Sequence, residues 1–460
     1  PLSVMSNWEA ELRKWAGEGS SSSSSCSLST LVYHKQGRKL SDADGKDVVL
    51  TTYAIVQKEW ETLAASDRFA AVILDEAQAI KNHRSLTSVA VKRISAGCGG
   101  IRVAITGTPV ENSLMELHSI MEFTVPGLLG DAKRFDVEYA KPLEKGVWPE
   151  GVEGSREEVK ERLQNAIAPF LLRRSKTDPG IAADLPEKIN IAHDVALTRE
   201  QKNLYALLQK WFLKKVEEFD SAAHGGQVVP EIQAQGFELT DGEVETAEGA
   251  LALETLSAAL KPAASGAHQA TIRKRRCILH MLYCLQQVCN HPAALQEKHS
   301  RLIDKAPFPH RTPEHSGKME RFVELLDEII SKGEKVLVFT QFLATLELLV
   351  EVVGKAQPHI ETVVMQGKVA KEDRVKIVEK FQTEPKCAVF FATLGTGGVG
   401  LTLTAARHVI HFDRCWNPAK EAQATDRAHR IGQRFTVMVH TITCRGTFEQ
   451  RLAAELRRKA

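Results

Sequence analysis

Hydrophobic residues in this chain follow two spacings, and each spacing predicts one type of element. Short runs of consecutive apolar residues are typical of strands buried inside a parallel sheet. Such runs lie at 69–74, 101–105, 335–340, 362–365, 387–392 and 408–412. Apolar residues three and four positions apart predict amphipathic helices, and the longest such stretches cover 199–218 and 271–288. Strands that alternate with helices indicate an α/β fold with parallel sheets flanked by helices.

The distribution of these patterns divides the chain into four parts. Strands and helices alternate near both ends, whereas the middle is helical and irregular. We expect a first lobe at 1–125, a helical protrusion and linker at 126–197, a second helical protrusion at 198–315 and a second lobe at 316–460. Residues 221–270 are rich in Ala, Gly, Glu and Gln, a composition that predicts a disordered insertion in the second protrusion.

Composition supports folded domains and gives no whole-chain sign of a nucleic-acid partner. The chain has 460 residues, 43% of them hydrophobic, which is enough for sizeable cores in about three domains. Its net charge of +2 is small, but basic residues are clustered, and local clusters set the attraction to phosphate. The clusters are Arg173, Arg174 and Lys176; 273–276; and Arg427, Arg430 and Arg434. A solvated helix face is the alternative interpretation of each cluster.

Cysteine spacing and the length of the apolar runs bear on zinc, disulfides and membranes. None of the eight cysteines belongs to a Cys-x-x-Cys pair, which indicates a reducing compartment without a disulfide framework. A zinc site could be suspected at Cys277, Cys284, Cys289 and His291. Their spacing differs from that of zinc ligands, so we expect a buried helix and no zinc. No apolar run reaches the roughly 18 residues of a membrane span, so no membrane is expected as a partner.

Two carboxylates follow the apolar run at 69–74. Open α/β sheets bind their ligands at the carboxyl ends of strands, where Asp75 and Glu76 are expected to lie. Asp75 would hold Mg²⁺ through water, because this ion gives up its hydration shell reluctantly. Glu76 would orient or deprotonate an attacking water.

Small hydroxyl residues follow the next apolar run, 101–105. Thr106 and Thr108 could bond the carboxylate pair and respond to a bound nucleotide. The alternative for Thr108 is to cap a helix that starts after Pro109.

A candidate arginine finger lies near the end of the chain. Arg427 and Arg430 are three residues apart within 423–433, so on a helix they would share one face and point at one anionic ligand. Paired guanidinium groups can stabilise the charge on a transferring phosphoryl group, which makes ATP or GTP the expected ligand. The alternative is a solvated basic face that ends in a C-cap at Gly432.

A glycine-rich turn lies between the apolar run at 387–392 and the arginines. Glycines would let its backbone N–H groups approach an anion, either the nucleotide or a DNA phosphate. Ordinary turns use the same residues. The candidate residues in this turn are Thr393, Gly397, Gly398, Gly400 and Thr402.

The order of these motifs resembles the Swi/Snf-type branch of the superfamily-two helicase-like ATPases. The matching strings span nearly the whole chain and include Asp75-Glu-Ala-Gln, Ile105-Thr-Gly-Thr-Pro, Pro169-Phe-Leu-Leu-Arg-Arg-Ser-Lys, Val288-Cys-Asn-His-Pro, Gly397-Gly-Val-Gly-Leu-Thr and the stretch 423–433. The resemblance implies two RecA-like lobes with ATP and Mg²⁺ in the cleft between them. It also implies a motor that moves along double-stranded DNA without separating its strands.

The resemblance assigns roles to further residues. Those that would contact DNA are Arg173, Arg174, Thr393, Thr402 and Trp416. Those that would bind the nucleotide or couple it to movement are Gln78, Thr106, Thr108, Gly397, Gly398, Gly400 and Gln423. Two alternatives remain open: Trp416 could anchor its loop in the core, and the glutamines could be ordinary surface residues.

One element of that family is absent from these 460 residues. The family's phosphate loop ends in Gly-Lys-Thr or Gly-Lys-Ser, whose backbone N–H groups and lysine hold the β and γ phosphates. Each Gly-Lys pair in this chain is followed by a different residue, namely Asp47, Met319, Ala356 or Val369. Residues 1–8 match a family segment that follows the loop, and we expect them to form a strand. We therefore expect a fragment that by itself hydrolyses ATP negligibly.

The sequence thus predicts a DNA-dependent ATPase of chromatin remodelling, transcription or DNA repair. Its partners would be double-stranded DNA and nucleosomes or other DNA-bound proteins. It would act in the nucleus of a eukaryote, or in the cytoplasm or nucleoid of a prokaryote. The alternative is a non-hydrolysing DNA-binding or scaffold module, which the presence of Glu76 and both arginines argues against.

Overall fold

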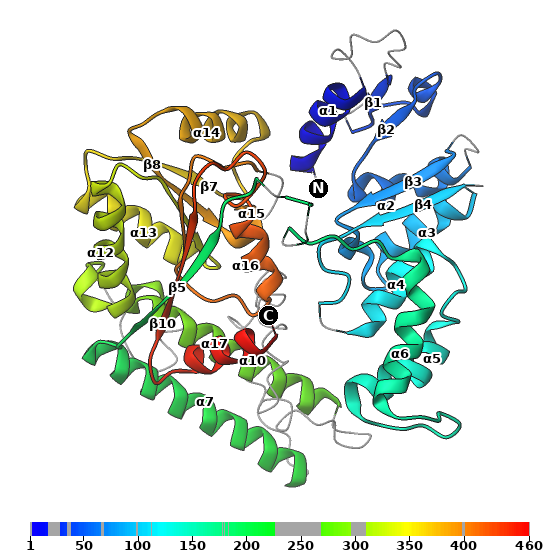
Figure 1. Ribbon diagram of the computed structural model, residues 1–460. Coiled ribbons are helices and arrows are strands. Elements are labelled where there is room, and N and C mark those ends of the chain that lie inside the picture. The colour runs from blue at the N-terminus through cyan, green and yellow to red at the C-terminus, as the bar shows by residue number, and fades with distance from the viewer. Residues whose placement is uncertain are drawn as a thin grey trace. The chain divides into compact units, whose positions relative to one another are not determined.

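The chain forms two compact units, Pro1–Asp178 (unit 1) and Pro179–Ala460 (unit 2) (Figure 1). The computed structural model describes residues 2–16, 28–34, 38–65, 69–97, 100–111, 113–176, 178, 180–182, 184–225, 268–295, 310–397 and 401–459.

Unit 1 contains two pairs of parallel strands. β3 (Ala71–Asp75) pairs with β4 (Ile101–Ile105), and β1 (Thr30–Val32) pairs with β2 (Val48–Leu50). The helices beside them are α1 (Leu2–Ala16), α2 (Tyr53–Ala64), α3 (Leu86–Gly97), α4 (Leu114–Thr124) and the 3₁₀ helix η2 (Ala77–Ile80). β3 and β4 confirm the strands expected at 69–74 and 101–105.

The expectation that the first of these strands is buried was wrong for one of its faces. Leu74 is 7% exposed and packs with Ile80 and Phe123, but Ile73 is 60% exposed and Ile101 on β4 is 66% exposed. Successive side chains of a strand point to opposite faces, so the helices of unit 1 cover only the Leu74 face. An unbroken apolar run does not reveal which of its faces a neighbour covers.

The beginning of the chain is a helix and not the expected strand. α1 contains mostly residues that favour helices, with Val4 as its β-branched exception. Two pairs of side chains four residues apart support it: Arg13 bonds Glu9 over 2.6 Å and the Trp15 indole donates to Glu11. Arg13 and Lys14 also lie in the last turn, where positive charge complements the helix dipole.

After β4, unit 1 continues as a series of helices. α4 is followed by α5 (Ala132–Phe135), a π-helix (Asp136–Lys145), α6 (Arg156–Ile167) and the 3₁₀ helix Ala168–Phe170. Their apolar faces meet around the fully buried Phe135, with Leu117 and Leu163 beside it. α6 begins with a capping box, because Ser155 and Glu158 each accept the other's backbone N–H.

Unit 2 is built on one sheet of six parallel strands in the order β5-β10-β9-β6-β8-β7. The strands are β5 (Lys188–Val195), β6 (Val336–Thr340), β7 (Glu361–Met365), β8 (Cys387–Thr393), β9 (His408–His411) and β10 (Val437–Cys444). Four of them, β6 to β9, confirm the strands expected in the second lobe.

Helices cover both faces of this sheet (Figure 1). On one face, Val336 and Val338 of β6 pack with α12 (Gly317–Ser331) and α13 (Leu343–Ala356). On the other, Leu337 and Phe339 pack with α14 (Lys371–Thr383) and α16 (Pro418–Thr425). Both faces of β6 are buried, which explains its unbroken apolar sequence and confirms the expected class of parallel sheets flanked by helices.

β5 lies within the range that we expected to be protrusion and linker, 126–197. It pairs along its whole length with β10, from Lys188 beside Val437 to Val195 beside Cys444. β5 is an edge strand and remains partly exposed, so its sequence mixes charged residues with Ile189 and Ile191. That mixture lacks the continuous apolar run of a central strand.

The two long helices expected in the second protrusion are present as α7 (Arg199–Gly225) and α10 (His268–Asn290). They pack together through Leu208, Phe212 and Tyr283, and α17 (Phe448–Lys459) lies against α10. The predicted disordered insertion, 221–270, is helical at its two described ends, and its residues 226–267 lie outside the described residues. None of the described helices combines the length and apolar character that a membrane crossing requires.

Candidate functional site

The carboxyl ends of β3 and β4 bring the predicted acidic and hydroxyl residues together. Asp75 is the last residue of β3 and lies beside Ile105 of β4, so Glu76 and Thr106 leave the sheet at the same edge. Parallel strands with equal register end together, as the sequence predicted.

Asp75 is held by two residues that sequence reasoning missed. The indole Nε1 of Trp8 donates to Oδ2 of Asp75 over 2.8 Å, and the Tyr53 hydroxyl donates to its backbone oxygen over 2.9 Å. Burial, followed by the charges of Asp75 and Glu76, raises the pKa of Tyr53, so this hydroxyl stays protonated. The backbone N–H of Glu76 donates to Oδ1 over 2.9 Å. The position of Trp8 in a string shared with the family was the available signal.

Glu76 has the left-handed backbone conformation, with φ 52° and ψ 53°. Among the described residues it is the one non-glycine residue with positive φ. That conformation costs an ordinary residue about 1–2 kcal/mol, and such strain is common at functional sites. It turns the Glu76 side chain toward Gln78, whose Nε2 donates to Oε2 of Glu76 over 2.6 Å.

Thr106 reaches the carboxylates through Gln78 and not directly. Its hydroxyl donates to Oε1 of Gln78 over 2.8 Å and accepts the backbone N–H of Thr108 over 3.1 Å. Glu76, Gln78 and Thr106 thus form one hydrogen-bonded network. Thr108 does not cap a helix after Pro109: α4 begins at Leu114, and Ser113 caps it by accepting the N–H of Met115.

The two arginines do not lie on a helix, so the expectation of a shared helix face was wrong. α16 begins at Pro418, with Asn417 as its N-cap, but it ends at Thr425. Residues 426–433 form a series of turns, which we call the arginine turn. Two N–H groups of the turn bond oxygens fewer than four residues back: Arg427 donates to Ala424 over 3.2 Å, and Arg430 donates to Ala428 over 3.1 Å. Leu403, whose N–H donates to the oxygen of Arg427 over 2.9 Å, and the Gln433 side chain, which donates to that of Ala428, hold the turn.

Buried side chains fix the arginine turn. Gln433 donates from Nε2 to the backbone oxygens of Thr404 and Ala406 and accepts the N–H groups of Arg434 and Phe435. His429 bonds the backbone oxygen of Pro186 over 2.8 Å. Sequence reasoning missed both residues.

The two arginines differ in their surroundings. Arg427 is 8% exposed, whereas Arg430 is half-buried, and its guanidinium makes no hydrogen bond or ion pair within the described part of the chain. Both lie in the turn that Gln433 and His429 hold.

The glycine-rich turn is described only in part. Thr393 ends β8 and its hydroxyl bonds that of Thr396, and α15 (Leu394–Gly397) follows. Thr402 is exposed, whereas the predicted residues Gly398 and Gly400 lie outside the described residues. Gln423 is half-buried on α16.

The residues predicted to contact DNA divide into exposed and buried ones. Arg173 and Arg174 are exposed in the segment after Phe170, as a phosphate contact requires. Trp416 is only 7% exposed, stacks on Phe448 and packs against Leu279 of α10. This burial favours the alternative in which Trp416 anchors its loop in the core.

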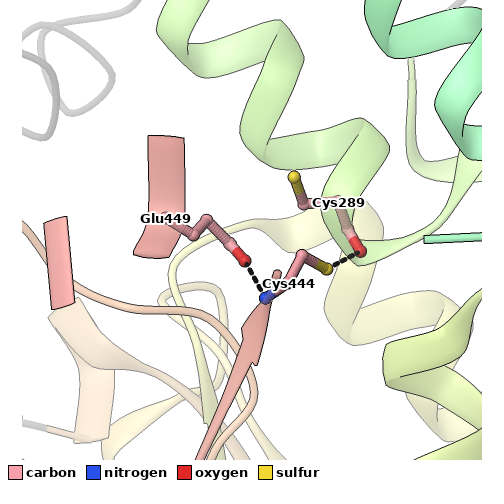
Figure 2. A group of neighbouring side chains, drawn as sticks. All are labelled: Cys289, Cys444 and Glu449. Atoms are coloured by element: carbon pink, nitrogen blue, oxygen red, sulfur yellow. Dashed lines mark hydrogen bonds between the residues drawn. The ribbon is translucent and has the colours of Figure 1, made fainter. Parts of the chain in front are cut away.

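A group of possible metal ligands is present, but not the one considered from the sequence. Cys289, Cys444 and Glu449 are fully buried and their ligand atoms lie within 4.8 Å of one another (Figure 2). Burial, and then a bond from Cys444, raises the pKa of Cys289, which opposes the thiolate form that metals bind. Glu449 bonds Lys318 over 2.6 Å and accepts the N–H of Cys444. We therefore interpret the group as a structural one.

Two family models match the chain. The SNF2-related domain matches residues 1–294, more than half of the chain, and the helicase conserved C-terminal domain matches residues 317–432. The chain belongs to the SNF2-related family. This membership confirms the Swi/Snf-type resemblance drawn from the motifs.

Relatives of this SNF2-family chain are named as ATP-dependent helicases and DNA repair proteins. YwqA of Bacillus subtilis, named as an ATP-dependent helicase/translocase, is 32% identical over 468 residues, which cover 100% of this chain and 42% of YwqA. DNA excision repair protein ERCC-6-like of Mus musculus is 29% identical and is matched over 98% of this chain and 36% of its own length. The chain thus spans less than half the length of these relatives.

A similar solved structure is the Sulfolobus solfataricus SWI2/SNF2 ATPase core in complex with dsDNA. It is 32% identical to this SNF2-family chain, with 99% of this chain and 78% of that one covered and a TM-score of 0.40.

Proposed function

We propose that this protein is an ATP-driven motor that moves along double-stranded DNA without separating its strands. The proposal is carried by the network at the carboxyl edge of β3 and β4, where Gln78 and Thr106 hold the strained Glu76 beside Asp75. Membership of a family with ATP-dependent helicases among its members supports ATP as the energy source.

The two carboxylates receive different roles because their surroundings differ. Each oxygen of Asp75 accepts one hydrogen bond from the protein and keeps further lone pairs, so it can accept from water bound to Mg²⁺. These acceptor oxygens fit an ion held through its hydration shell, and bound Mg²⁺ would neutralise phosphate charge. Glu76 accepts the Gln78 amide at Oε2, and its carboxylate would orient or deprotonate the attacking water.

The arginines would act on the phosphate groups of the same reaction. Arg430 is half-buried, so it can combine a defined position with access to a ligand. A guanidinium group that meets the charge developing on the transferred phosphoryl group lowers the reaction barrier. Arg427 would share this role from the same turn.

DNA would be held through its phosphates. Arg173 and Arg174 are exposed, and Thr402 is exposed after the glycine-rich turn, so each can reach a backbone phosphate. Phosphate contacts carry no sequence information directly, which suits a protein that must move along any sequence. Nucleosomes or other DNA-bound proteins would be the obstacles or substrates of such movement.

ATP hydrolysis tests the proposal. The chain contains no Gly-Lys-Thr or Gly-Lys-Ser loop, so the 460 residues by themselves should hydrolyse ATP negligibly. If the transcript upstream of Pro1 encodes such a loop, a protein that includes it should show DNA-stimulated hydrolysis, which Glu76→Gln should abolish. If the 460 residues alone hydrolyse ATP strongly and Glu76→Gln abolishes this activity, the prediction that hydrolysis requires the loop is wrong. A start codon at this point would favour the scaffold alternative.

Movement along DNA needs a separate assay. The extended protein should displace the third strand of a triplex and leave a forked duplex intact. Efficient unwinding of the fork would contradict translocation without strand separation. Activity on neither substrate, with hydrolysis retained, would limit the function to a DNA-dependent ATPase.

A further inference from the structure

A chain of buried contacts joins α10 to the loop that precedes α16. Gln286 of α10 donates from Nε2 to the backbone oxygen of Arg414 over 2.8 Å, and Gln341 donates to the same oxygen over 2.7 Å. Asn290, at the end of α10, donates to the neighbouring Asp413 over 3.0 Å. Gln286, Asn290 and Asp413 are almost completely buried, so these bonds do not compete with bulk water.

The next contact joins this loop to α16 through a bidentate ion pair. Nε and Nη2 of Arg414 lie 3.0 Å from Oε1 and Oε2 of Glu421 respectively, and the N–H of Cys415 also donates to Oε1 of Glu421. Two parallel bonds between planar groups fix orientation as well as distance. Both side chains are about one-tenth exposed, so removal of either charge leaves the other buried without its partner.

The last contacts join α16 to the arginine turn. α16 has only eight residues, and the turn begins at Asp426, directly after its last residue. The Thr425 hydroxyl bonds His411 of β9 over 2.9 Å, and Gln433 holds the far side of the turn. A rotation of so short a helix would therefore displace Arg427 and Arg430.

We infer that Gln286, Arg414 and Glu421 are positioning residues of the ATPase reaction, which place the arginine turn according to the position of α10. The inference rests on the proposed function, because it assigns the arginines a role in hydrolysis. Stability alone does not explain a buried ion pair, since well-packed apolar residues at the same positions stabilise a protein at least as much. The fixed geometry of this pair suits a site where guanidinium groups must be placed accurately.

The first experiment measures hydrogen–deuterium exchange in the 460-residue chain and needs no ATPase activity. Glu421→Gln keeps the shape of the side chain but removes its charge, so backbone exchange in 426–433 should become about tenfold faster. Glu361→Gln is the matched control, because Glu361 forms a 2.7 Å ion pair with Lys380 on the exposed side of β7. The control should leave exchange in 426–433 unchanged.

The second experiment measures kinetics in a protein extended upstream of Pro1 to include a phosphate loop. Glu421→Gln should lower kcat by about 10- to 100-fold with the KM for ATP changed less than about threefold, because the displaced arginines act mainly in the transition state. Arg414→Lys keeps the charge but not the bidentate geometry, and should fall between Glu421→Gln and the wild type. Gln286→Leu should also lower kcat with little change in KM, but by a smaller factor. Melting temperatures check that each variant is folded.

The outcomes separate the inference from the proposed function. If Glu421→Gln leaves both the exchange in 426–433 and kcat unchanged, the inference is overturned. The proposed function still stands in that case, provided that the wild-type protein hydrolyses ATP. A parallel loss of stability and of kcat, with no recovery in Arg414→Lys, would also overturn it in favour of a merely structural pair. A wild-type protein without ATPase activity would contradict the proposed function, and the inference with it.

Discussion

His440 and His408 lie on the neighbouring strands β10 and β9 with their rings stacked, and Nε2 of His440 lies 3.0 Å from Nδ1 of His408. His193 on β5 continues the row, with its Nε2 3.0 Å from Nδ1 of His440. Arg321 donates to His193 at one end, and Glu334 accepts from His408 at the other. If all three histidines are neutral and carry the proton on Nε2, each Nε2–H donates to the next acceptor in the row, and every hydrogen bond is satisfied.

This row predicts acid sensitivity. Burial lowers the pKa of each histidine, that of His440 to about 3, and protonated neighbours would oppose one another further. The unfolded chain then binds more protons than the folded one below about pH 6.5, so the free energy of unfolding should fall as pH falls from there, by up to about 1.4 kcal/mol per pH unit for each histidine. Chemical denaturation of the 460-residue chain between pH 8 and pH 5 measures it.

Variants assign this slope to the row. His440→Gln can still accept from His193 and donate to His408 but cannot titrate, so the slope below pH 6.5 should become shallower. The exposed His359 provides the control His359→Gln, which should keep the wild-type slope. Other charged groups face the row, namely Asp194, Glu328, Lys332 and Arg407. Equal slopes in the wild type and His440→Gln would assign the acid sensitivity to groups outside the row.

Arg430→Ala should lower kcat for ATP by roughly 10³-fold or more in a protein extended upstream to include a phosphate loop, while nucleotide affinity stays within a few-fold. The reason is that a finger arginine meets charge that develops only in the transition state. Steady-state kinetics and equilibrium binding of a fluorescent nucleotide measure the two quantities. Arg427→Ala should behave similarly, and Arg445→Ala, at an exposed position after β10, is the control. Equal losses of binding and turnover would indicate a ground-state clamp instead.

DNA binding by the 460-residue chain should be independent of sequence and should weaken steeply as salt rises, because bound phosphates release counterions. Arg173→Ala and Arg174→Ala should each reduce the slope of log K against log salt by about 0.9, the contribution of one phosphate contact. Fluorescence anisotropy of a labelled duplex at several salt concentrations measures this slope. Lys160→Ala on the exposed face of α6 is the matched control. A constant affinity from low to moderate salt would contradict the phosphate contacts.

Lys318→Met should destabilise unit 2 by about 3–5 kcal/mol, because it leaves the fully buried Glu449 without its ion-pair partner. Burial lowers the pKa of Lys318, but Glu449 and the other acidic groups nearby outweigh burial and raise it. Urea unfolding measures the change. Adding Glu449→Gln to Lys318→Met should recover part of the loss. Lys355→Met, which breaks an exposed pair with Glu351, should cost about 0.5 kcal/mol or less.

The sequence by itself determined the central strands and the acidic end of β3. The strands β6 and β8 are covered on both sides, so nearly every residue in them is apolar and the pattern is visible within a few neighbouring positions. Asp75 follows such a run directly, and the register of two parallel strands then places Thr106 beside Glu76. The order of the motifs along the chain was enough to identify the family.

Only the tertiary structure decided where α16 ends, which side of Trp416 is covered and where β5 pairs. Local spacing favoured a helix through Arg430, but the chain leaves the helix after Thr425, and Leu403 and Gln433 bond the backbone of the arginine turn. Trp416 is buried because α10 and α17 close over it, and both are remote in sequence. β5 becomes a strand by pairing with β10. In each case the deciding partner is a distant segment, and short-range periodicity carries no information about which distant segments meet.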